Sequence, residues 1–259
     1  MPFEYRPTHR FFFSTASEAG EEIILTEREA HHAAKVLRVR TGERVSVLDG
    51  KGLECICEIR EIAKREVTLA VVARKTYPAP RSRLTLVQAL TKGKAFDVIL
   101  QKATELGVSR IVPLAAERSV AYVDEDDTAD KTEKWQATLI EAMKQSGCPW
   151  LPSIELPISA KALLSRPDLQ SELTLIASLQ SGARHPREHF QEFFIQHERQ
   201  PGSVAVWVGP EGDFTPAEVK LALAAGAQPI TLGRTVLRAD TAAIYCLSVI
   251  SYELASAQD

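Results

Sequence analysis

The chain has 259 residues, of which 45% are hydrophobic and 25% charged, and its formal net charge is −3. This composition is ordinary for a soluble globular protein and long enough for one large domain or two smaller ones. No apolar run approaches the length of a membrane span, and the N-terminal MPFEYRPTHR lacks the apolar stretch of a signal peptide. We therefore expect a cytoplasmic protein without membrane association.

The first third of the chain is predicted to be a small, mainly antiparallel β domain. Strands are indicated at residues 10–13, 23–25, 44–50, 53–62 and 66–74. The DGKG sequence between the third and fourth of these is typical of a hairpin. Thr26 and Glu29 predict a capping box that opens a short helix through Val36. Residues 75–83 hold two prolines and no periodicity, which favours a linker.

Strands and helices alternate beyond residue 83, a pattern typical of a mainly parallel sheet covered by helices. Strands are indicated at residues 84–90, 110–115, 173–179, 204–209 and 229–232. Two helices are expected to end at Gly107 and Gly147, and TPAE at 215–218 predicts a capped helix start. The last helix, at 241–254, is apolar around most of its circumference, and a homodimer interface is the simplest cover for it.

The cysteines and histidines predict neither disulfides nor a metal site. No two of the four cysteines form a CxxC pair, and Cys55 and Cys57 would lie on one face of a strand. His31 and His32 point about 100° apart on a helix, so they cannot readily share a metal ion. No Cys or carboxylate completes a zinc spacing.

Charge is unevenly distributed along the chain. Residues 1–83 contain 15 Lys and Arg against 12 Asp and Glu, whereas the remainder contains 16 against 22. A mild basic excess is compatible with phosphate contacts and equally with a solvated surface, so charge alone does not decide between them.

Two glycine-containing loops near the C-terminus are the most informative segments. VWVGPEGDF (206–214) and LGRTVLRADTA (232–242) each resemble a buried strand that enters a loop and then a helix, where open α/β proteins bind ligands. Gly209 and Gly212 would let a ligand approach the backbone closely. GPEG alone is more often a plain strand-to-helix turn. The second loop, with Arg238 and Asp240 before a buried helix that Asp240 or Thr241 can cap, favours one shared pocket.

Seven segments taken in order form a longer pattern. They are RFFF (10–13), HHAAKVLRVRTGE (31–43), QKATELGVSRIVP (101–113), ERS (117–119), EAMKQS (141–146), GPEGDF and LGRTVLRADTA. The pattern resembles the bacterial 16S ribosomal RNA uridine N3-methyltransferases, which are S-adenosylmethionine (SAM) enzymes of the SPOUT class. The resemblance implies an α/β protein with a PUA-like RNA-binding β-barrel domain (1–76), a linker (77–82) and a SPOUT methyltransferase domain (83–259). It also implies that the latter is trefoil-knotted, with helices on both faces of a mainly parallel sheet.

The resemblance further implies methyl transfer from SAM to N3 of uridine 1498 in 16S ribosomal RNA, by a homodimer acting on the 30S subunit. The residues implied to hold SAM are Ser178, Leu179, Gln180, Gly209, Pro210, Glu211, Gly212, Leu232, Gly233, Val236, Leu237, Arg238, Thr241 and Ala242. Two residues depart from the family pattern, because Asp213 replaces a usual second Gly and Cys148 a usual Arg. Asp tolerates such a turn but adds negative charge, and without the Arg one RNA or partner-subunit contact is in question.

The sulfonium of SAM is already an activated leaving group, so the protein must chiefly align the methyl carbon with N3 and exclude water. The N3 proton must also leave, either to a base or with help from a cation that favours the uridine anion. We assign the cation to Arg238 and the base to Glu211 or Asp240. The alternatives are a salt bridge or phosphate clamp for Arg238 and, as the favoured role, a helix N-cap for Asp240.

The RNA-facing residues implied by the resemblance are Arg10, His31, Lys35, Arg38, Arg40, Lys92 and Arg118. Phosphate contacts of this kind position a substrate without reading its sequence, and a solvated face is the competing interpretation. Two rival functions remain: a SPOUT enzyme that methylates ribose or another base of rRNA or tRNA, and a noncatalytic RNA-binding or ribosome-assembly factor. The two intact cofactor loops favour an enzyme.

Overall fold

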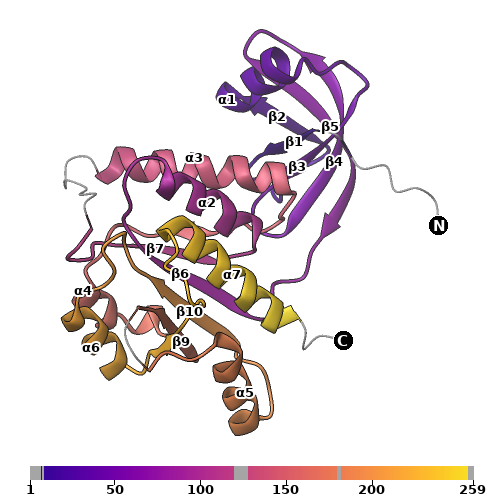
Figure 1. Ribbon diagram of the computed structural model, residues 1–259. Helices are drawn as coiled ribbons and strands as arrows, with labels where there is room; N and C mark the ends of the chain where they lie inside the picture. The colour runs from indigo at the N-terminus through magenta and orange to yellow at the C-terminus, as the bar shows by residue number, and fades with distance from the viewer. Residues whose placement is uncertain (1–6, 8, 120–127, 180–181, 256–259) are drawn as a thin grey trace. The chain divides into compact units, whose positions relative to one another are not determined.

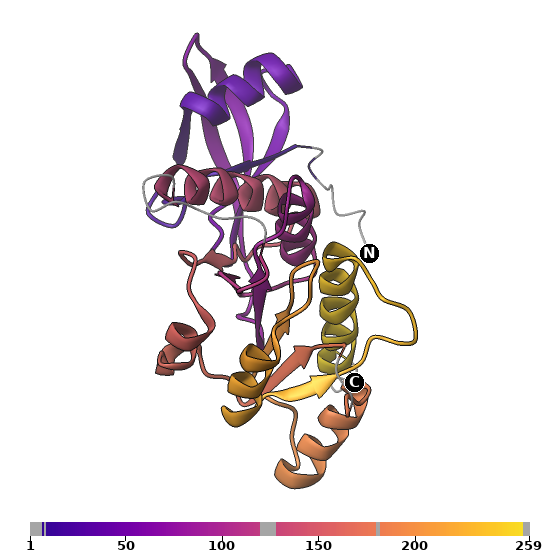
Figure 2. The ribbon, with the colours of Figure 1, turned by 60° about the vertical axis from the view of Figure 1, so that its left-hand side comes forward.

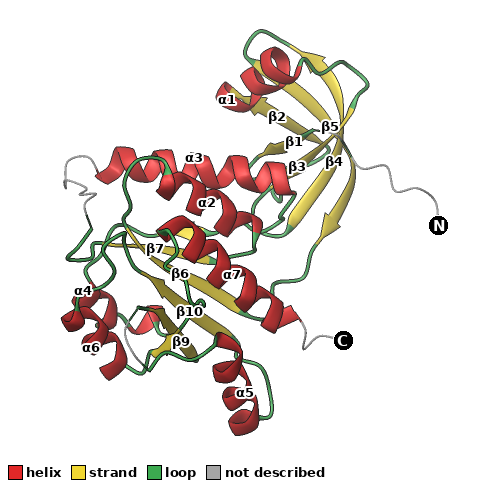
Figure 3. Cartoon of the chain, in the orientation of Figure 1, coloured by secondary structure: helices red, strands yellow, loops and turns green. Residues whose placement is uncertain are grey.

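A computed structural model describes residue 7 and residues 9–119, 128–179 and 182–255 of the protein. The chain divides into two compact units, and each unit is formed by two segments. Met1–Ala79 and Ile140–Leu151 form the first unit, and Pro80–Leu139 and Pro152–Asp259 form the second. Helix α3 (Thr128–Ser146) contributes residues to both. Figure 1 labels most of the elements, and Figure 3 colours them by type.

The first unit contains a five-stranded sheet in the order β1-β3-β4-β5-β2. The strands are β1 (Arg10–Phe12), β2 (Glu22–Thr26), β3 (Arg44–Leu48), β4 (Leu53–Ile62) and β5 (Glu66–Thr76). β1 pairs in parallel with β3, and the other neighbours are antiparallel. The predicted, mainly antiparallel β domain is therefore confirmed.

The predicted hairpin joins β3 to β4. Asp49 Oδ1 accepts hydrogen bonds from the backbone N–H groups of Lys51 (2.7 Å) and Leu53 (2.9 Å). Gly50 and Gly52 have φ values of 71° and 96°, a conformation that favours glycine. An Asp followed by two such glycines thus specifies this turn locally.

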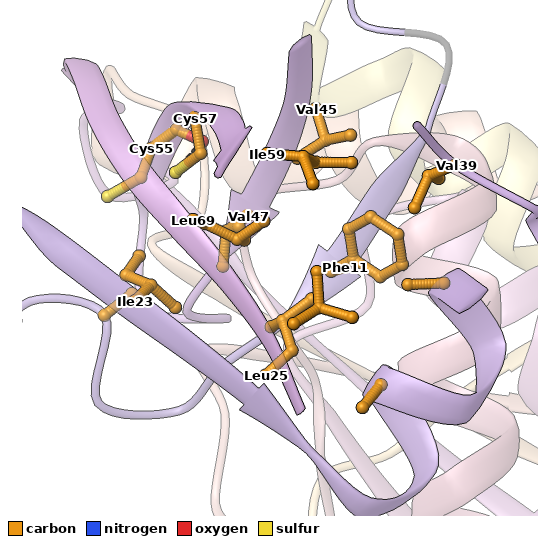
Figure 4. Packing of buried hydrophobic residues seen from close by; sticks show 14 residues of the cluster. Phe11, Ile23, Leu25, Val39, Val45, Val47, Cys55, Cys57, Ile59 and Leu69 are labelled. Atoms are coloured by element: carbon orange, nitrogen blue, oxygen red, sulfur yellow. Dashed lines mark hydrogen bonds between the residues drawn. The ribbon is translucent and has the colours of Figure 1, made fainter. Parts of the chain in front are cut away.

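Alternating side chains of the sheet form the core of the first unit (Figure 4). Val45 and Val47 of β3 and Cys55, Cys57 and Ile59 of β4 are all fully buried. The two cysteines share one face of β4, as predicted, and are free thiols. Burial raises the pKa of Cys57 to about 12, so its thiol stays protonated and behaves as a small apolar group.

The short helix of the first unit begins where it was expected but without the predicted cap. α1 (Glu27–His31) continues into a π-helical turn, η1 (His32–Leu37), and the Thr26 side chain makes no capping bond. The Glu29 carboxylate instead accepts hydrogen bonds from Phe12 N–H (3.0 Å) and Lys144 Nζ (2.7 Å). Because Lys144 is buried, its ammonium needs an anionic partner. The capping-box prediction is wrong for that reason.

The second unit contains a six-stranded sheet in the order β11-β9-β10-β6-β7-β8, in which every neighbouring pair is parallel. The strands are β6 (Arg83–Ala89), β7 (Arg110–Leu114), β8 (Ser153–Ile154), β9 (Leu173–Ala177), β10 (Ser203–Val208) and β11 (Gln228–Ile230). Five of them were predicted, and the two-residue β8 was not. The predicted α/β fold with a parallel sheet is confirmed, while the trefoil knot stays a prediction.

Helices cover both faces of this sheet (Figure 2). α2 (Ala95–Glu105) and α7 (Ala239–Ala255) pack together on one face, whereas α4 (Ala160–Leu164) and α6 (Pro216–Ala224) pack on the other. α5 (Pro186–His197) lies against α7, and a short 3-10 turn, η2 (Pro167–Leu169), follows α4. Within the described ranges, no helix has both the length and the apolar character needed to cross a membrane.

The helix ends confirm three local predictions and contradict one. Gly107 and Gly147 have positive φ just after α2 and α3, and α6 has the predicted capping box, with Thr215 as its N-cap. α7, however, begins at Ala239, because the Arg238 carbonyl accepts the first helical hydrogen bond. Asp240 therefore lies within the first turn, and the prediction that Asp240 or Thr241 is the N-cap is wrong.

Candidate functional site

A cavity of about 420 Å³ lies in the second unit, at the carboxyl ends of β9, β10 and β11. Parallel strands end at one edge of their sheet, so the loops that follow adjacent strands meet there. The volume lies within the range of small-molecule sites. The lining residues are Ala177, Ser178, Leu179, Gly182, Ala183, Val208, Gly209, Pro210, Glu211, Asp213, Ile230, Thr231, Leu232, Gly233, Arg234, Thr235, Val236, Leu237, Ala239 and Ala242.

Most residues predicted to hold a cofactor line this cavity. They are Ser178, Leu179, Gly209, Pro210, Glu211, Leu232, Gly233, Val236, Leu237 and Ala242. Gly212, Arg238 and Thr241 do not line it, and Gln180 falls outside the described residues. The two glycine loops thus contribute to one cavity, whereas their role in holding a cofactor stays a prediction.

The other lining residues show what sequence inspection missed. Ala177, Val208 and Ile230 are the last residues of their strands, so strand ends alone could have indicated them. Arg234 and Thr235 lie inside the second loop, and Ala239 is the first residue of α7. All three fall between residues that were predicted to hold the cofactor. Gly182 and Ala183 lie in the segment after β9, and no sequence motif there indicated that they would line a cavity.

The loop after β10 is a tight turn built around Gly209 and Asp213. A Cβ atom added to Gly209 would lie 3.3 Å from the Phe214 nitrogen, so a side chain there would force the turn to shift. Asp213 N–H donates to the Pro210 carbonyl (3.0 Å), and Asp213 has a φ of 57°. The Asp213 carboxylate accepts hydrogen bonds from Phe214 N–H (2.8 Å) and Leu179 N–H (3.3 Å).

Two neighbouring loops hold the β10 loop from outside the cavity. After β6, Lys92 N–H donates to Glu211 Oε1 (3.2 Å). After β7, Arg118 Nη1 donates to the Gly212 carbonyl (3.0 Å), and Glu117 N–H donates to Glu218 Oε1 (2.9 Å). Lys92 and Arg118, both predicted to contact RNA, therefore lie beside the candidate site.

A buried histidine anchors β11 at the other side of the cavity. His189 Nδ1 lies 3.0 Å from Arg184 Nη2, and its Nε2 lies 3.2 Å from the Pro229 carbonyl oxygen. A guanidinium can only donate and a carbonyl can only accept, so Nδ1 accepts and Nε2 carries the proton. Burial lowers the pKa of His189, which keeps the ring neutral.

The three predicted catalytic residues are not equally placed. Glu211 lines the cavity and its side chain is exposed. Arg238 is exposed at the start of α7, outside the lining, and Asp240 Oδ1 accepts a hydrogen bond from Thr241 N–H (2.8 Å). Of the two candidate bases, Glu211 lines the cavity and Asp240 does not.

In the first unit, the predicted RNA-contacting residues have two kinds of environment. Arg10 Nη1 donates to the carbonyls of Lys144 and Gln145 at the end of α3 (both 3.3 Å), a structural role that sequence reasoning missed. The other four, which are exposed, are His31, Lys35, Arg38 and Arg40. Their exposure fits phosphate contacts and a solvated face alike.

Cys148, where the resemblance led us to expect an Arg, is half-buried, and its Sγ donates to the Trp150 carbonyl (3.3 Å). Burial raises the pKa of this thiol, so it is neutral and does not replace an Arg charge. In the part of the chain that the structure describes, no three His, Cys, Asp or Glu side chains are grouped to bind a metal ion.

Comparison with known families identifies the class of protein. A family described as an RNA methyltransferase domain matches residues 78–251, and one described as an RNA methyltransferase PUA domain matches residues 25–72. The chain belongs to the RNA methyltransferase family and has an N-terminal PUA-like domain.

The similarity extends to particular proteins. The ribosomal RNA small subunit methyltransferase E of Synechocystis is 31% identical, over 92% of this chain and 77% of that protein. A Legionella pneumophila protein solved with bound SAM has a TM-score of 0.85 and 28% identity, covering 96% of this chain and 98% of that one. The Neisseria gonorrhoeae ribosomal RNA small subunit methyltransferase E, solved with SAM, has a TM-score of 0.80 and 28% identity, covering 94% and 97%.

Proposed function

We propose that this protein transfers the methyl group of SAM to N3 of uridine 1498 in 16S ribosomal RNA. The Synechocystis and Neisseria gonorrhoeae relatives are named ribosomal RNA small subunit methyltransferase E, and the Legionella and Neisseria structures contain SAM. The observation that most strongly supports the proposal is the cavity itself, because two separate glycine loops and the end of β9 line it together.

The cavity residues fit a SAM molecule chemically. Gly209 and Gly233 leave backbone groups open to a ligand. Glu211 adds a carboxylate to the lining, which suits the positive charge of the donor. Bound SAM would supply an activated methyl group, so the chain's main task is to orient that group and exclude water.

Proton removal from uridine N3 is the step that needs side-chain chemistry. We assign the base to Glu211, which borders the cavity, and retain Asp240, at the start of α7, as the alternative. Arg238 is exposed, so an RNA base could reach its guanidinium. A cation there would stabilise the uridine anion or clamp a phosphate.

RNA binding is proposed for residues 1–76, with residues 77–82 as the linker and residues 83–259 as the knotted catalytic domain. The exposed residues at 31, 35, 38 and 40 would contact phosphates there, and Lys92 and Arg118 would do so beside the cavity. We further propose a homodimer that acts on the 30S subunit in the cytoplasm. Tyr245 and Tyr252 support the dimer, because both are exposed on the largely apolar α7.

Two measurements test this function. Calorimetry should detect SAM binding to the purified protein, and absence of binding would instead favour a noncatalytic RNA-binding or assembly factor. Incubation with radiolabelled SAM should then label 30S subunits or naked 16S RNA. Labelling of tRNA alone would contradict the proposed substrate.

A further inference from the structure

We propose that Asp213 is a positioning residue that fixes the backbone of Leu179 at the wall of the cavity and thereby raises the affinity for the methyl donor. The inference rests on the proposed function, because it takes SAM as the ligand of this cavity.

The backbone of Asp213 is held in a conformation that ordinary residues avoid. Four described non-glycine residues have a positive φ, namely Glu27, Arg38, Glu198 and Asp213. A glycine at position 213 would adopt this conformation at no steric cost. An aspartate there therefore needs compensation from its side chain.

The side chain supplies that compensation through two backbone groups. One carboxylate oxygen accepts from Phe214 N–H (2.8 Å), which closes the turn locally. The other accepts from Leu179 N–H (3.3 Å), 34 residues away in the chain. The carboxylate therefore links the loop after β10 to the segment after β9.

This link acts on a part of the cavity wall with little packing of its own. Leu179 lines the cavity, but its side chain is 65% exposed, so burial in the core does not fix it. Fixing the backbone before the ligand arrives removes an ordering cost from the binding step. Asp213 should therefore increase affinity for any ligand that contacts this wall.

Substitutions at position 213 can remove the bond to Leu179 N–H while keeping the turn after β10. Asp213→Gly keeps the left-handed backbone and removes the carboxylate. Asp213→Asn also tolerates this backbone, but it has one acceptor oxygen, which can satisfy Phe214, and its NH2 group cannot accept from Leu179 N–H. Glu198→Gly is the matched control, since Glu198 has a φ of 55° at the end of α5 and does not line the cavity.

The test is calorimetric titration of the full-length wild type and the three variants with SAM and with S-adenosylhomocysteine. Thermal unfolding without ligand verifies that each variant is folded. We expect the dissociation constants of both ligands to rise about tenfold in Asp213→Gly and Asp213→Asn, which corresponds to about 1.4 kcal/mol, and to stay unchanged in Glu198→Gly.

The two ligands differ in the charge on sulfur, so they distinguish a positional effect from an electrostatic one. Weaker binding of SAM alone would overturn the inference, because it would show that Asp213 acts by attracting the sulfonium. Unchanged binding of both ligands by the folded Asp213 variants would also overturn it. A wild-type protein that binds neither ligand would instead overturn the proposed function, and this inference with it.

Discussion

Replacing Glu218 by Ala should destabilise the second unit, because it removes a buried carboxylate that accepts several hydrogen bonds. Glu218 is 4% exposed, and its carboxylate accepts from Glu117 N–H (2.9 Å), Thr215 N–H (2.9 Å) and Thr215 Oγ1 (3.1 Å). The Ala variant keeps the Thr215 N-cap but loses the reciprocal bond of the capping box, from Thr215 N–H to the Glu218 carboxylate. Hydrogen bonds to a charged group contribute about 1.5–3 kcal/mol each. Because Thr215 and Glu117 lie near solvent and regain water contacts, we expect a total of about 3 kcal/mol.

A loss of this size should lower the melting temperature by about 6–12 °C for a unit of this length. Differential scanning calorimetry would measure the shift, and Glu133→Ala, which deletes an exposed acidic residue of α3, is the matched control. Glu218→Gln should fall between the two, because its single acceptor oxygen cannot serve both loops. A Glu218→Ala shift no larger than that of the control would show that these hydrogen bonds do not stabilise the second unit.

Three further changes have defined outcomes. Arg238→Ala should lower the rate of methyl transfer about 100-fold with SAM affinity nearly intact; unchanged turnover would remove Arg238 from the catalytic mechanism. Since burial lowers the pKa of His189, the unfolded chain takes up its proton more readily, so stability should fall as pH drops below about 6.5. His189→Gln should weaken that dependence in melting curves, and an equally steep dependence would contradict the assignment of a neutral ring. The Arg199 hydrogen bonds and Gly202 N–H lower the pKa of Glu172 to about 2, so its stabilising effect should be present above about pH 4.5 and disappear as pH falls toward 2. Glu172→Gln should flatten acid unfolding in this window, and identical acid curves would contradict that effect.

Local sequence patterns predicted the elements well where the causes are local. Alternating apolar residues mark β4 over the same ten residues that the structure assigns. Thr215, Pro216 and Glu218 specify the start of α6 within four residues. The sheet of the second unit was predictable as parallel, because helices separate its strands along the chain.

Local predictions failed where a residue distant in the chain takes the hydrogen-bonding group that the local pattern needs. Glu29 looked like half of a capping box, but Lys144, 115 residues away, and Phe12 take its carboxylate. Residues 140–151 likewise join the first unit, although the segments that flank them in the chain, 80–139 and 152–259, form the second unit. Such pairings depend on tertiary contacts that no local window contains.

The candidate site was predictable in outline for a different reason. Parallel strands present their following loops at one edge, so two glycine loops sufficed to indicate one cavity. The link from Asp213 to Leu179 was not predictable, since its two partners lie 34 residues apart and no pattern connects them. Sequence could identify Asp213 as unusual but could not show what its carboxylate binds.

Locating the transferred methyl group tests the proposed function most directly. 30S subunits from cells that lack this protein would be incubated with the purified enzyme and SAM, and the 16S RNA would be digested and mapped by mass spectrometry. We expect a single 3-methyluridine, at position 1498. A methyl group on ribose, on another base or at another position, or no methyl group at all, would contradict it.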